Sequence, residues 1–217
     1  MTLISGLKNL RRMKIGIVDY GAGNINSVYN TIYNLGYNPK IIEKPEQIST
    51  FEKLIIPGVG SAFKSLEILK ERGFFSEIQK LINTNTTILG ICLGFQIFSE
   101  YLYEDGKSKG LNFIGGNVVP INNPSIFNIG WNKVQLTKGM ANKIGIKKNS
   151  EFYFCHSYYL NNVVEENKKF ILGKINFHKE IPSLVVKNNF MGVQFHPEKS
   201  QTNGQKLMKY FLNWEIK

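Results

Sequence analysis

Short apolar runs alternate with amphipathic segments along the first half of the chain. Apolar runs of about four to eight residues are typical of buried strands, whereas apolar residues spaced three or four apart are typical of surface helices. The pattern predicts a strand at 14–19, a helix at 24–35, strands at 39–43 and 53–57, helices at 62–71 and 74–83, a strand at 87–91 and a helix at 94–103. This alternation indicates a sheet with helices packed on its faces.

The second half of the chain is richer in strand-like runs. They predict strands near 116–121, 132–136, 151–155, 169–177, 183–187 and 190–195, followed by a helix from about 201 to 213. The pair Asn188-Asn189 predicts a tight turn before the last of these strands. We therefore expect an α/β fold with a mostly parallel central sheet, flanking helices and a β-rich, partly antiparallel second half.

A single folding unit accounts for most of the chain. At 217 residues, a chain is long enough to bury roughly 70% of its unfolded surface. No internal repeat, low-complexity tract or linker divides it. Because Met13 directly precedes the first predicted strand, we expect residues 1–12 to be a short extension and residues 13–217 to be one domain.

The composition is that of a compact soluble protein, with 42% hydrophobic and 20% charged residues. Lys and Arg outnumber Asp and Glu by 27 to 16, which gives a net charge of +11. The basic residues are scattered and are not interleaved with aromatic ones, so we expect no nucleic-acid binding. The charge fits a solvated surface with a bias toward an acidic partner.

The two cysteines, Cys92 and Cys155, lie in apolar runs and lack metal-ligand spacing. This usage favours a reducing compartment, and no stretch approaches the roughly 18 apolar residues of a membrane span. In residues 1–12 the basic residues follow a very short apolar run, which is the reverse of a secretory signal. The glycine-rich run at 19–24 lacks the third glycine of a dinucleotide fingerprint. We expect a cytoplasmic protein with no metal, no cofactor and no membrane association.

The strongest chemical signal is the segment from Leu89 to Gln96, where Cys92 ends an apolar strand and a helical pattern follows. This order is typical of a strand-turn-helix elbow that presents a nucleophile. Gly90 and Gly94 flank Cys92 two residues away on each side and leave room for a strained backbone. Since the start of a helix also favours a thiolate, we predict a reactive Cys92 and a buried packing role for Cys155.

A thiolate nucleophile needs a proton carrier for the leaving amine. The chain has three histidines, His156, His178 and His196. Pro197 and Glu198 follow His196, so an extended segment would project His196 and Glu198 to the same side. We predict that Glu198 orients His196 and that His196 serves Cys92, in the manner of a nucleophile-base-orienter triad.

Attack on an amide carbonyl develops an oxyanion, which requires backbone N–H donors near the nucleophile. One candidate donor is Leu93, directly after Cys92. The other is the loop of Pro57, Gly58, Val59 and Gly60, whose glycines let the backbone approach a ligand closely. Taken alone, this loop fits an ordinary strand-to-helix turn equally well.

Together these motifs resemble those of the class I glutamine amidotransferases, and more narrowly those of the glutaminase subunits of imidazole glycerol phosphate synthase. The similar segments run from Lys14 nearly to the C-terminus and lie at 18–24, 57–60, 90–94, 129–132, 156–159 and 192–200. Two positions depart from the family pattern. Asn128 stands where the family usually has histidine, and Phe95 stands where it usually has methionine.

The resemblance implies that Cys92 attacks the side-chain amide of glutamine, that His196 transfers the proton and that Glu198 orients His196. It implies that the substrate is held by Gln96, Glu104, Ser157, Tyr158 and the loop from Gly58 to Gly60. It further implies a heterodimer in which ammonia enters a (βα)8-barrel cyclase subunit that makes imidazole glycerol phosphate and a purine-pathway intermediate. Trp131 and Lys199 match family positions near the subunit contact.

The residues themselves indicate only nucleophilic amide hydrolysis, so other functions stay open at this point. Similar glutaminase subunits serve enzymes that amidate bacterial surface sugars. A stand-alone cysteine hydrolase or peptidase would keep the same elbow. A non-catalytic binding subunit would have no need for Cys92, His196 and Glu198 together.

Overall fold

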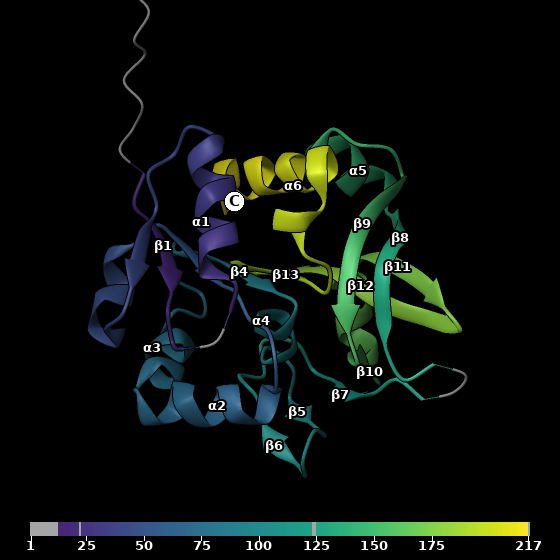
Figure 1. The fold of residues 1–217 in the computed structure, drawn as a ribbon, viewed down its shortest axis with the longest axis horizontal. Helices are drawn as coiled ribbons and strands as arrows, with labels where there is room; N and C mark the ends of the chain where they lie inside the picture. Colours follow the sequence, from purple (N-terminus) through teal and green to yellow (C-terminus); the bar gives the residue numbers. More distant parts are fainter. Residues whose placement is uncertain (1–12, 22, 123–124, 217) are drawn as a thin grey trace, which may run out of the picture.

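A mixed β-sheet forms the centre of the structure, a computed structural model (Figure 1). The structure describes residues 13–21, 23–122 and 125–216, and the predicted extension at 1–12 lies outside the described residues. Within the described part, nine strands pair in the order β2-β1-β3-β4-β13-β12-β11-β8-β9. A smaller sheet has the order β10-β7-β5-β6.

The strands of the first half are parallel, as predicted. They are β1 (Ile15–Val18), β2 (Lys40–Ile42), β3 (Lys53–Ile56) and β4 (Thr87–Ile91), and β13 (Phe190–Val193) pairs with β4 in the same direction. The carboxyl ends of neighbouring parallel strands meet at one edge of the sheet. The segments that follow β3, β4 and β13 therefore come together, although they are far apart in the sequence.

The second half extends the same sheet with antiparallel strands, which confirms the predicted change of direction. These strands are β12 (Lys179–Lys187), β11 (Ile171–Phe177), β8 (Asn128–Leu136) and β9 (Asn149–His156). Asn188 has a φ of 52° in the predicted turn before β13. The smaller sheet consists of β5 (Tyr101–Leu102), β6 (Ser108–Lys109), β7 (Asn117–Pro120) and β10 (Tyr158–Asn161).

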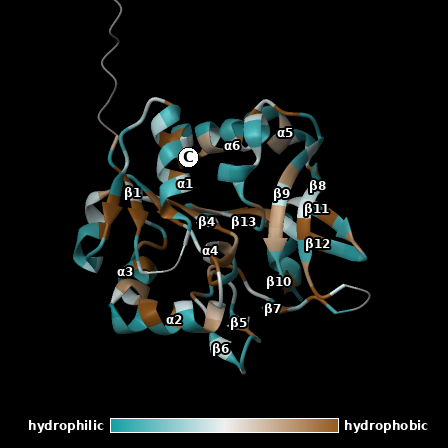
Figure 2. Ribbon diagram, in the orientation of Figure 1, coloured by the Kyte–Doolittle hydropathy of each residue, from teal (hydrophilic) through white to brown (hydrophobic). Residues whose placement is uncertain are grey.

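Helices cover both faces of the parallel half of the sheet (Figure 1). One face is covered by α1 (Ile25–Asn34) and α6 (Gln201–Asn213), the other by α2 (Ala62–Glu71) and α3 (Phe74–Lys80). Side chains alternate across a strand, so Ile17 packs in one core with Val28 whereas Val18 packs in the other with Leu66. Figure 2 shows the apolar strands between helices whose outer faces are hydrophilic.

The helix predicted at 94–103 is wrong beyond its first turn. In the structure, α4 spans Leu93–Gln96 and β5 follows. The carbonyls of Ile97 and Phe98 accept from Leu111 N–H at 2.7 Å and from Phe113 N–H at 2.8 Å. Because a later segment occupies these acceptors, they do not continue a helical ladder.

Several elements depart from the sequence pattern in polar regions of the chain. The strand predicted at 132–136 begins at Asn128, and the strand predicted at 183–187 begins at Lys179. The pattern also does not predict α5 (Lys138–Ile144) or β10. In β8 the buried positions are separated by exposed Lys133 and Gln135, so tertiary pairing rather than local hydrophobicity defines its length.

Candidate active site

Cys92 lies at the sharp turn between β4 and α4. Its φ of 53° and ψ of −105° fall in a region that residues other than glycine rarely adopt. The flanking glycines permit the close packing: a Cβ on Gly94 would lie 1.9 Å from the carbonyl oxygen of Ile56, and a Cβ on Gly90 would lie 2.5 Å from the Phe98 ring. The elbow geometry predicted for Cys92 is therefore present.

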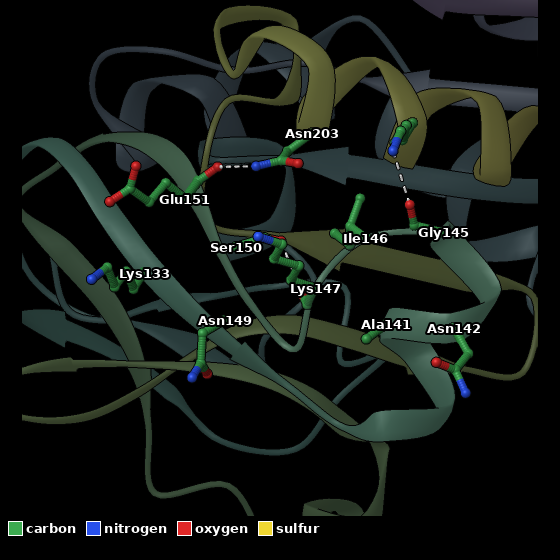
Figure 3. A pocket seen from close by; sticks show the side chains of 11 residues that line it. Lys133, Ala141, Asn142, Gly145, Ile146, Lys147, Asn149, Ser150, Glu151 and Asn203 are labelled. Carbon is green, nitrogen blue, oxygen red and sulfur yellow. Dashed lines mark hydrogen bonds between the residues drawn. The ribbon is translucent and has the colours of Figure 1, made fainter.

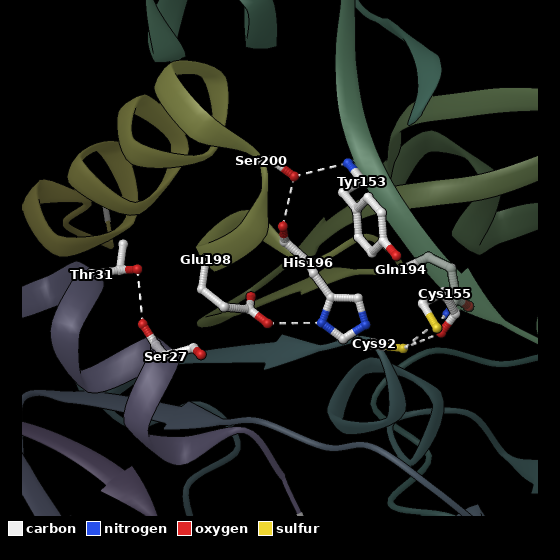
Figure 4. Close-up of polar contacts among 9 residues, drawn as sticks. All are labelled: Ser27, Thr31, Cys92, Tyr153, Cys155, Gln194, His196, Glu198 and Ser200. Atoms are coloured by element: carbon white, nitrogen blue, oxygen red, sulfur yellow. Dashed lines mark hydrogen bonds and ion pairs between the residues drawn. The ribbon is translucent and has the colours of Figure 1, made fainter. Parts of the chain in front are cut away.

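His196 and Glu198 meet through a turn and not through the extended segment expected from the sequence. The residues Pro197–Lys199 form a short 3-10 helix, η3, because Lys199 N–H donates to the His196 carbonyl at 3.0 Å. This turn brings Glu198 Oε1 to 2.8 Å from His196 Nδ1 (Figure 4). The two side chains are only 3% and 1% exposed, so water does not compete for the contact.

Ser200 and Tyr153, whose roles the sequence pattern does not predict, hold this turn in place. The Ser200 hydroxyl donates to the His196 carbonyl at 2.6 Å and accepts from Tyr153 N–H at 2.9 Å (Figure 4). His196 N–H in turn donates to the Tyr153 carbonyl at 2.8 Å. The N–H of His196 is thus hydrogen-bonded directly to β9, and its carbonyl is linked to β9 through Ser200.

The neighbours of His196 determine its charge. Burial by itself lowers the pKa of His196, but hydrogen bonding to the Cys92 sulfur and to Glu198, together with the charges of both groups, raises that pKa to about 10. The ring is therefore an imidazolium at neutral pH. A cation beside a sulfur atom favours the thiolate form of the sulfur.

The Cys92 sulfur opens into a cavity of about 270 Å³. The cavity brings together most of the residues selected from the sequence, namely Val59, Gly60, Cys92, Leu93, Gln96, Glu104, Ser157, Tyr158, His196 and Lys199. Phe127, Ile129, Cys155 and His156 complete the lining. Gly58 is not among the lining residues, and a Cβ added there would lie 2.8 Å from the Leu93 side chain. Trp131 lies outside the cavity and packs edge-on against Tyr153.

Backbone donors and one carboxylate contribute to the lining of the cavity. Leu93 is the first residue of α4, a position whose N–H has no acceptor within the helix. The loop after β3 is anchored by Tyr20, whose hydroxyl donates to the Pro57 carbonyl at 2.9 Å, and Gly60 adopts a φ of 91°. Glu104 accepts from Ala62 N–H at 2.6 Å, so this carboxylate is fixed at the start of α2.

One edge of the sheet holds a cysteine at a strand-turn-helix elbow, a buried histidine-carboxylate pair and a cavity with backbone donors. The family model for class-I glutamine amidotransferase matches residues 16–214. The chain belongs to the class I glutamine amidotransferases. This amidotransferase is 39% identical over 198 residues to the imidazole glycerol phosphate synthase subunit HisH of Caldanaerobacter subterraneus, covering 91% of this chain and 96% of the relative. It is 42% identical over 204 residues to subunit HisH 2 of Methanococcus maripaludis, covering 91% and 98%.

The fold of this amidotransferase is also similar to that of a solved structure. The structure of PurLQS from Thermotoga maritima superposes with a TM-score of 0.73 at 18% sequence identity, covering 93% of this chain and 98% of the solved one. At that level of identity the likeness concerns the fold. The fold and the membership in an enzyme family are therefore established by independent observations.

Cys155 is exposed, which corrects the expectation of a buried packing residue. Along β9 the side chains alternate, so Phe154 and His156 are buried while Cys155 lies on the opposite face. Its backbone carbonyl lies 3.7 Å from the Cys92 sulfur. An apolar run in the sequence therefore does not bury every member of a strand that has one open face.

A second hollow of this amidotransferase, of about 770 Å³, lies between α6 and the connection from α5 to β9 (Figure 3). Its lining includes Lys133, Lys147 and Lys206, and Lys206 Nζ donates to the Gly145 carbonyl at 3.0 Å. No cysteine or histidine is among its lining residues. Cys92 and His196 both line the smaller cavity instead.

Two kinds of feature are absent from residues 13–21, 23–122 and 125–216. No helix in these ranges has the length and apolar character needed to cross a membrane. In the same ranges, no three side chains of His, Cys, Asp or Glu are grouped closely enough to hold a metal ion.

Proposed function

We propose that the chain is the glutaminase subunit of imidazole glycerol phosphate synthase and acts in histidine biosynthesis as part of a cytoplasmic heterodimer. The names of the two HisH relatives support this proposal, since each is aligned over more than nine-tenths of its length. The observation that carries the chemistry is the buried contact of His196 with Glu198 beside Cys92. The reaction is the hydrolysis of glutamine to glutamate and ammonia.

In the first step, the Cys92 thiolate attacks the side-chain amide carbon of glutamine and forms a tetrahedral intermediate. The N–H of Leu93 and the loop at Gly58, Val59 and Gly60 supply donors for its oxyanion. His196 gives its proton to the leaving nitrogen, so ammonia departs and a glutamyl thioester remains. His196 then takes a proton from water, which attacks the thioester and releases glutamate and the thiolate.

The glutamine occupies the cavity, with its amide at Cys92. Ser157, Tyr158 and Glu104 all line the cavity, so polar groups are available for the amino and carboxylate ends of the substrate. Gln96 uses its side-chain Nε2 to donate to the Tyr158 carbonyl at 2.8 Å. A contact between Gln96 and glutamine therefore falls to its carbonyl oxygen.

The partner is a (βα)8-barrel cyclase that docks on a surface beside the cavity, which we call the partner face and define as Phe127, Ile129, Trp131 and Lys199. Its three apolar members are 49%, 60% and 47% exposed, respectively, and large apolar side chains gathered on a surface are typical of interaction sites. Phe127 and Ile129 also line the cavity. A subunit seated on this face would cover the cavity and receive the ammonia away from water.

The decisive experiment is reconstitution with the cyclase subunit. Glutamate release from glutamine is measured for the chain alone, with the cyclase, and with the cyclase plus the cyclase's own substrate. We expect little turnover alone, strong stimulation in the full mixture, and loss of turnover in Cys92→Ala. Equal turnover by the wild type and Cys92→Ala would refute the glutaminase assignment.

The same measurements separate the remaining alternatives. Stimulation by a surface-sugar amidation synthase but not by the cyclase would keep the chemistry and overturn the choice of partner. Full activity toward peptides without any partner, combined with indifference to glutamine, would assign a stand-alone cysteine hydrolase instead. Tight binding of the cyclase with no turnover by the wild type would assign a non-catalytic subunit.

A further inference from the structure

A buried chain of hydrogen bonds ends on the nucleophile through a residue outside the proposed triad. Gln194 is completely buried, two residues before His196, and its side-chain Nε2 lies 3.8 Å from the Cys92 sulfur (Figure 4). Its Oε1 accepts from Gln96 Nε2 at 3.3 Å. Gln96 Nε2 also donates to the Tyr158 carbonyl at 2.8 Å. The chain thus connects a main-chain carbonyl of β10 to the catalytic sulfur through two amides.

The main-chain carbonyl fixes which way both amides point. A carbonyl oxygen can only accept, so the atom of Gln96 that faces Tyr158 must be its NH₂ group. The same NH₂ group faces Gln194, whose carbonyl oxygen must therefore be the nearer atom. The NH₂ group of Gln194 is then left to face Cys92. The Tyr158 carbonyl oxygen can only accept a hydrogen bond, so it determines that the NH₂ group of Gln194 faces the sulfur.

His156 supports the same carbonyl from the other side. His156 Nδ1 lies 2.8 Å from the Tyr158 carbonyl, so Nδ1 carries a hydrogen. In the neutral ring Nε2 is then an acceptor, and it lies 3.2 Å from the side-chain amide of Asn128. Asn128 Oδ1 in turn accepts from Asn132 Nδ2 at 2.9 Å. The tautomer and the amides along this chain are mutually consistent.

The surroundings of the sulfur show why a donor is needed there. The Cys155 carbonyl lies 3.7 Å from Cys92 and can accept from the thiol but not from the thiolate. Facing an anionic sulfur, that carbonyl dipole is unfavourable. A buried N–H donor on the same sulfur opposes this effect, and hydrogen bonds to charged groups are stronger than those between neutral groups.

We infer that Gln194 is a further catalytic residue, whose side-chain amide donates to the Cys92 thiolate and which Gln96 and the Tyr158 carbonyl hold in the donating orientation. The inference rests on the proposed function, because it assigns Gln194 to the same nucleophile. It differs from the action of His196 in one respect. The amide keeps its hydrogen throughout the cycle and faces the sulfur both when the thiolate attacks and when it is released, whereas the imidazolium gives up its proton and regains it in between.

The test measures the ionisation of Cys92 without glutamine and without a partner. In a Cys155→Ser background, Cys92 is the only thiol of the chain, and its rate of alkylation by iodoacetamide is followed as a function of pH. Gln194→Met keeps a long buried side chain but removes the donor. We expect the alkylation midpoint to rise by about one pH unit, which is a tenfold change in the thiolate equilibrium. Gln194→Glu, which places an acceptor at the sulfur, is expected to raise it further.

Two companion variants separate this role from a loss of packing. Gln135→Met changes an exposed glutamine of β8 and should leave the midpoint unchanged. Gln96→Met frees Gln194 to rotate and should raise the midpoint by less than Gln194→Met does. An unchanged midpoint in folded Gln194→Met would overturn the inference, and so would an unchanged midpoint in Gln96→Met if Gln194→Met does not fold. If the variants shift the alkylation midpoint as expected but the wild type with its partner never hydrolyses glutamine, the proposed function is refuted and the inference about Gln194 stands.

Discussion

Glu198 Oε1 lies 2.8 Å from His196 Nδ1, and both side chains are excluded from water. This pair fixes the proton on one ring nitrogen and leaves the other nitrogen for the Cys92 sulfur. Hydrogen bonding to the Cys92 sulfur and to Glu198 outweighs the effect of burial and raises the pKa of His196 to about 10, so the ring keeps its charge at neutral pH. The imidazolium can then protonate a leaving nitrogen that would depart poorly as an amide anion.

Replacing Glu198 with Gln should lower the pKa of His196 from its raised value of about 10, because the neutral amide removes one of the negative charges that hold the proton. In the wild type with its partner, activity should persist until the pH approaches 10 and fall above it. In Glu198→Gln this alkaline limb should move to lower pH, and kcat should drop about 100-fold or more.

The pH profile of glutamate release is the measurement for that change. Glu180→Gln is the matched control, because Glu180 forms an exposed ion pair with Lys174 at 3.0 Å and lies outside the cavity lining. A profile of Glu198→Gln that overlays the wild-type profile would contradict the role assigned to Glu198.

His156 should make the stability of the protein sensitive to mild acid. Burial, partly offset by the hydrogen bond to the Tyr158 carbonyl and reinforced by the charge of His196, lowers the pKa of His156 from 6.5 to about 4. The folded pKa is depressed, so the unfolded chain takes up the proton first and stability falls as the pH drops below 6.5. His196 has the opposite sign, because its folded pKa is raised to about 10 while its unfolded pKa is ordinary, but its contribution is common to the wild type and to His156→Gln and cancels in their comparison.

Denaturant unfolding at pH 7 and pH 5 measures this effect. The wild type should lose roughly 2 kcal/mol more of its free energy of unfolding than His156→Gln over that interval. Equal losses in the two proteins would show that His156 is not held neutral by its surroundings.

Gly94 should be intolerant of any side chain. A Cβ there would lie 1.9 Å from the Ile56 carbonyl oxygen, and a backbone atom cannot move aside as a side-chain tip can. Gly94→Ala should cost about 1–3 kcal/mol of stability and displace the elbow. Gly139→Ala in α5, where no atom lies within 4 Å of the added Cβ, should instead stabilise the protein by about 0.5–1 kcal/mol. Denaturant midpoints of the two variants should therefore shift in opposite directions.

Trp131 should contribute to the partner face without contributing to chemistry. Trp131 is half exposed and contacts Tyr153, but it does not line the cavity. Trp131→Ala should weaken cyclase binding by about tenfold or more, since buried aromatic side chains often dominate interfaces. Titration of the stimulated glutaminase activity with cyclase measures this. Tyr33→Ala, at an exposed aromatic residue of α1, is the control and should leave the titration unchanged.

The elements that could be predicted from the sequence are those with a strong local signal. The apolar runs of β1, β3 and β4 are buried on both faces, so hydrophobicity alone marks them. The elbow at Cys92 was predictable because glycines on both sides of a cysteine at a strand end are typical of that sharp turn. The contact between His196 and Glu198 was expected in an extended segment, but it forms in a 3-10 turn that depends on Ser200 and on the backbone of β9.

The remaining errors concern residues whose environment is set by distant parts of the chain. The end of α4 is determined by Leu111 and Phe113, which follow it after an intervening hairpin. The exposure of Cys155 depends on which face of β9 meets the core. Gln194 lies in an apolar run, and only the arrangement of Gln96 and Tyr158 shows that its amide faces the sulfur.

The most direct test of the central claim is to ask which cysteine reacts with a glutamine-like diazoketone. The chain has only two cysteines, one buried in the elbow and one exposed in the same cavity, so Cys155 is an internal control. Peptide mass spectrometry of the partner-bound protein should find the label on Cys92 alone, with protection by glutamine and no label in Cys92→Ala. Label on Cys155 in preference to Cys92, or labelling of Cys92 that glutamine does not slow, would contradict the account.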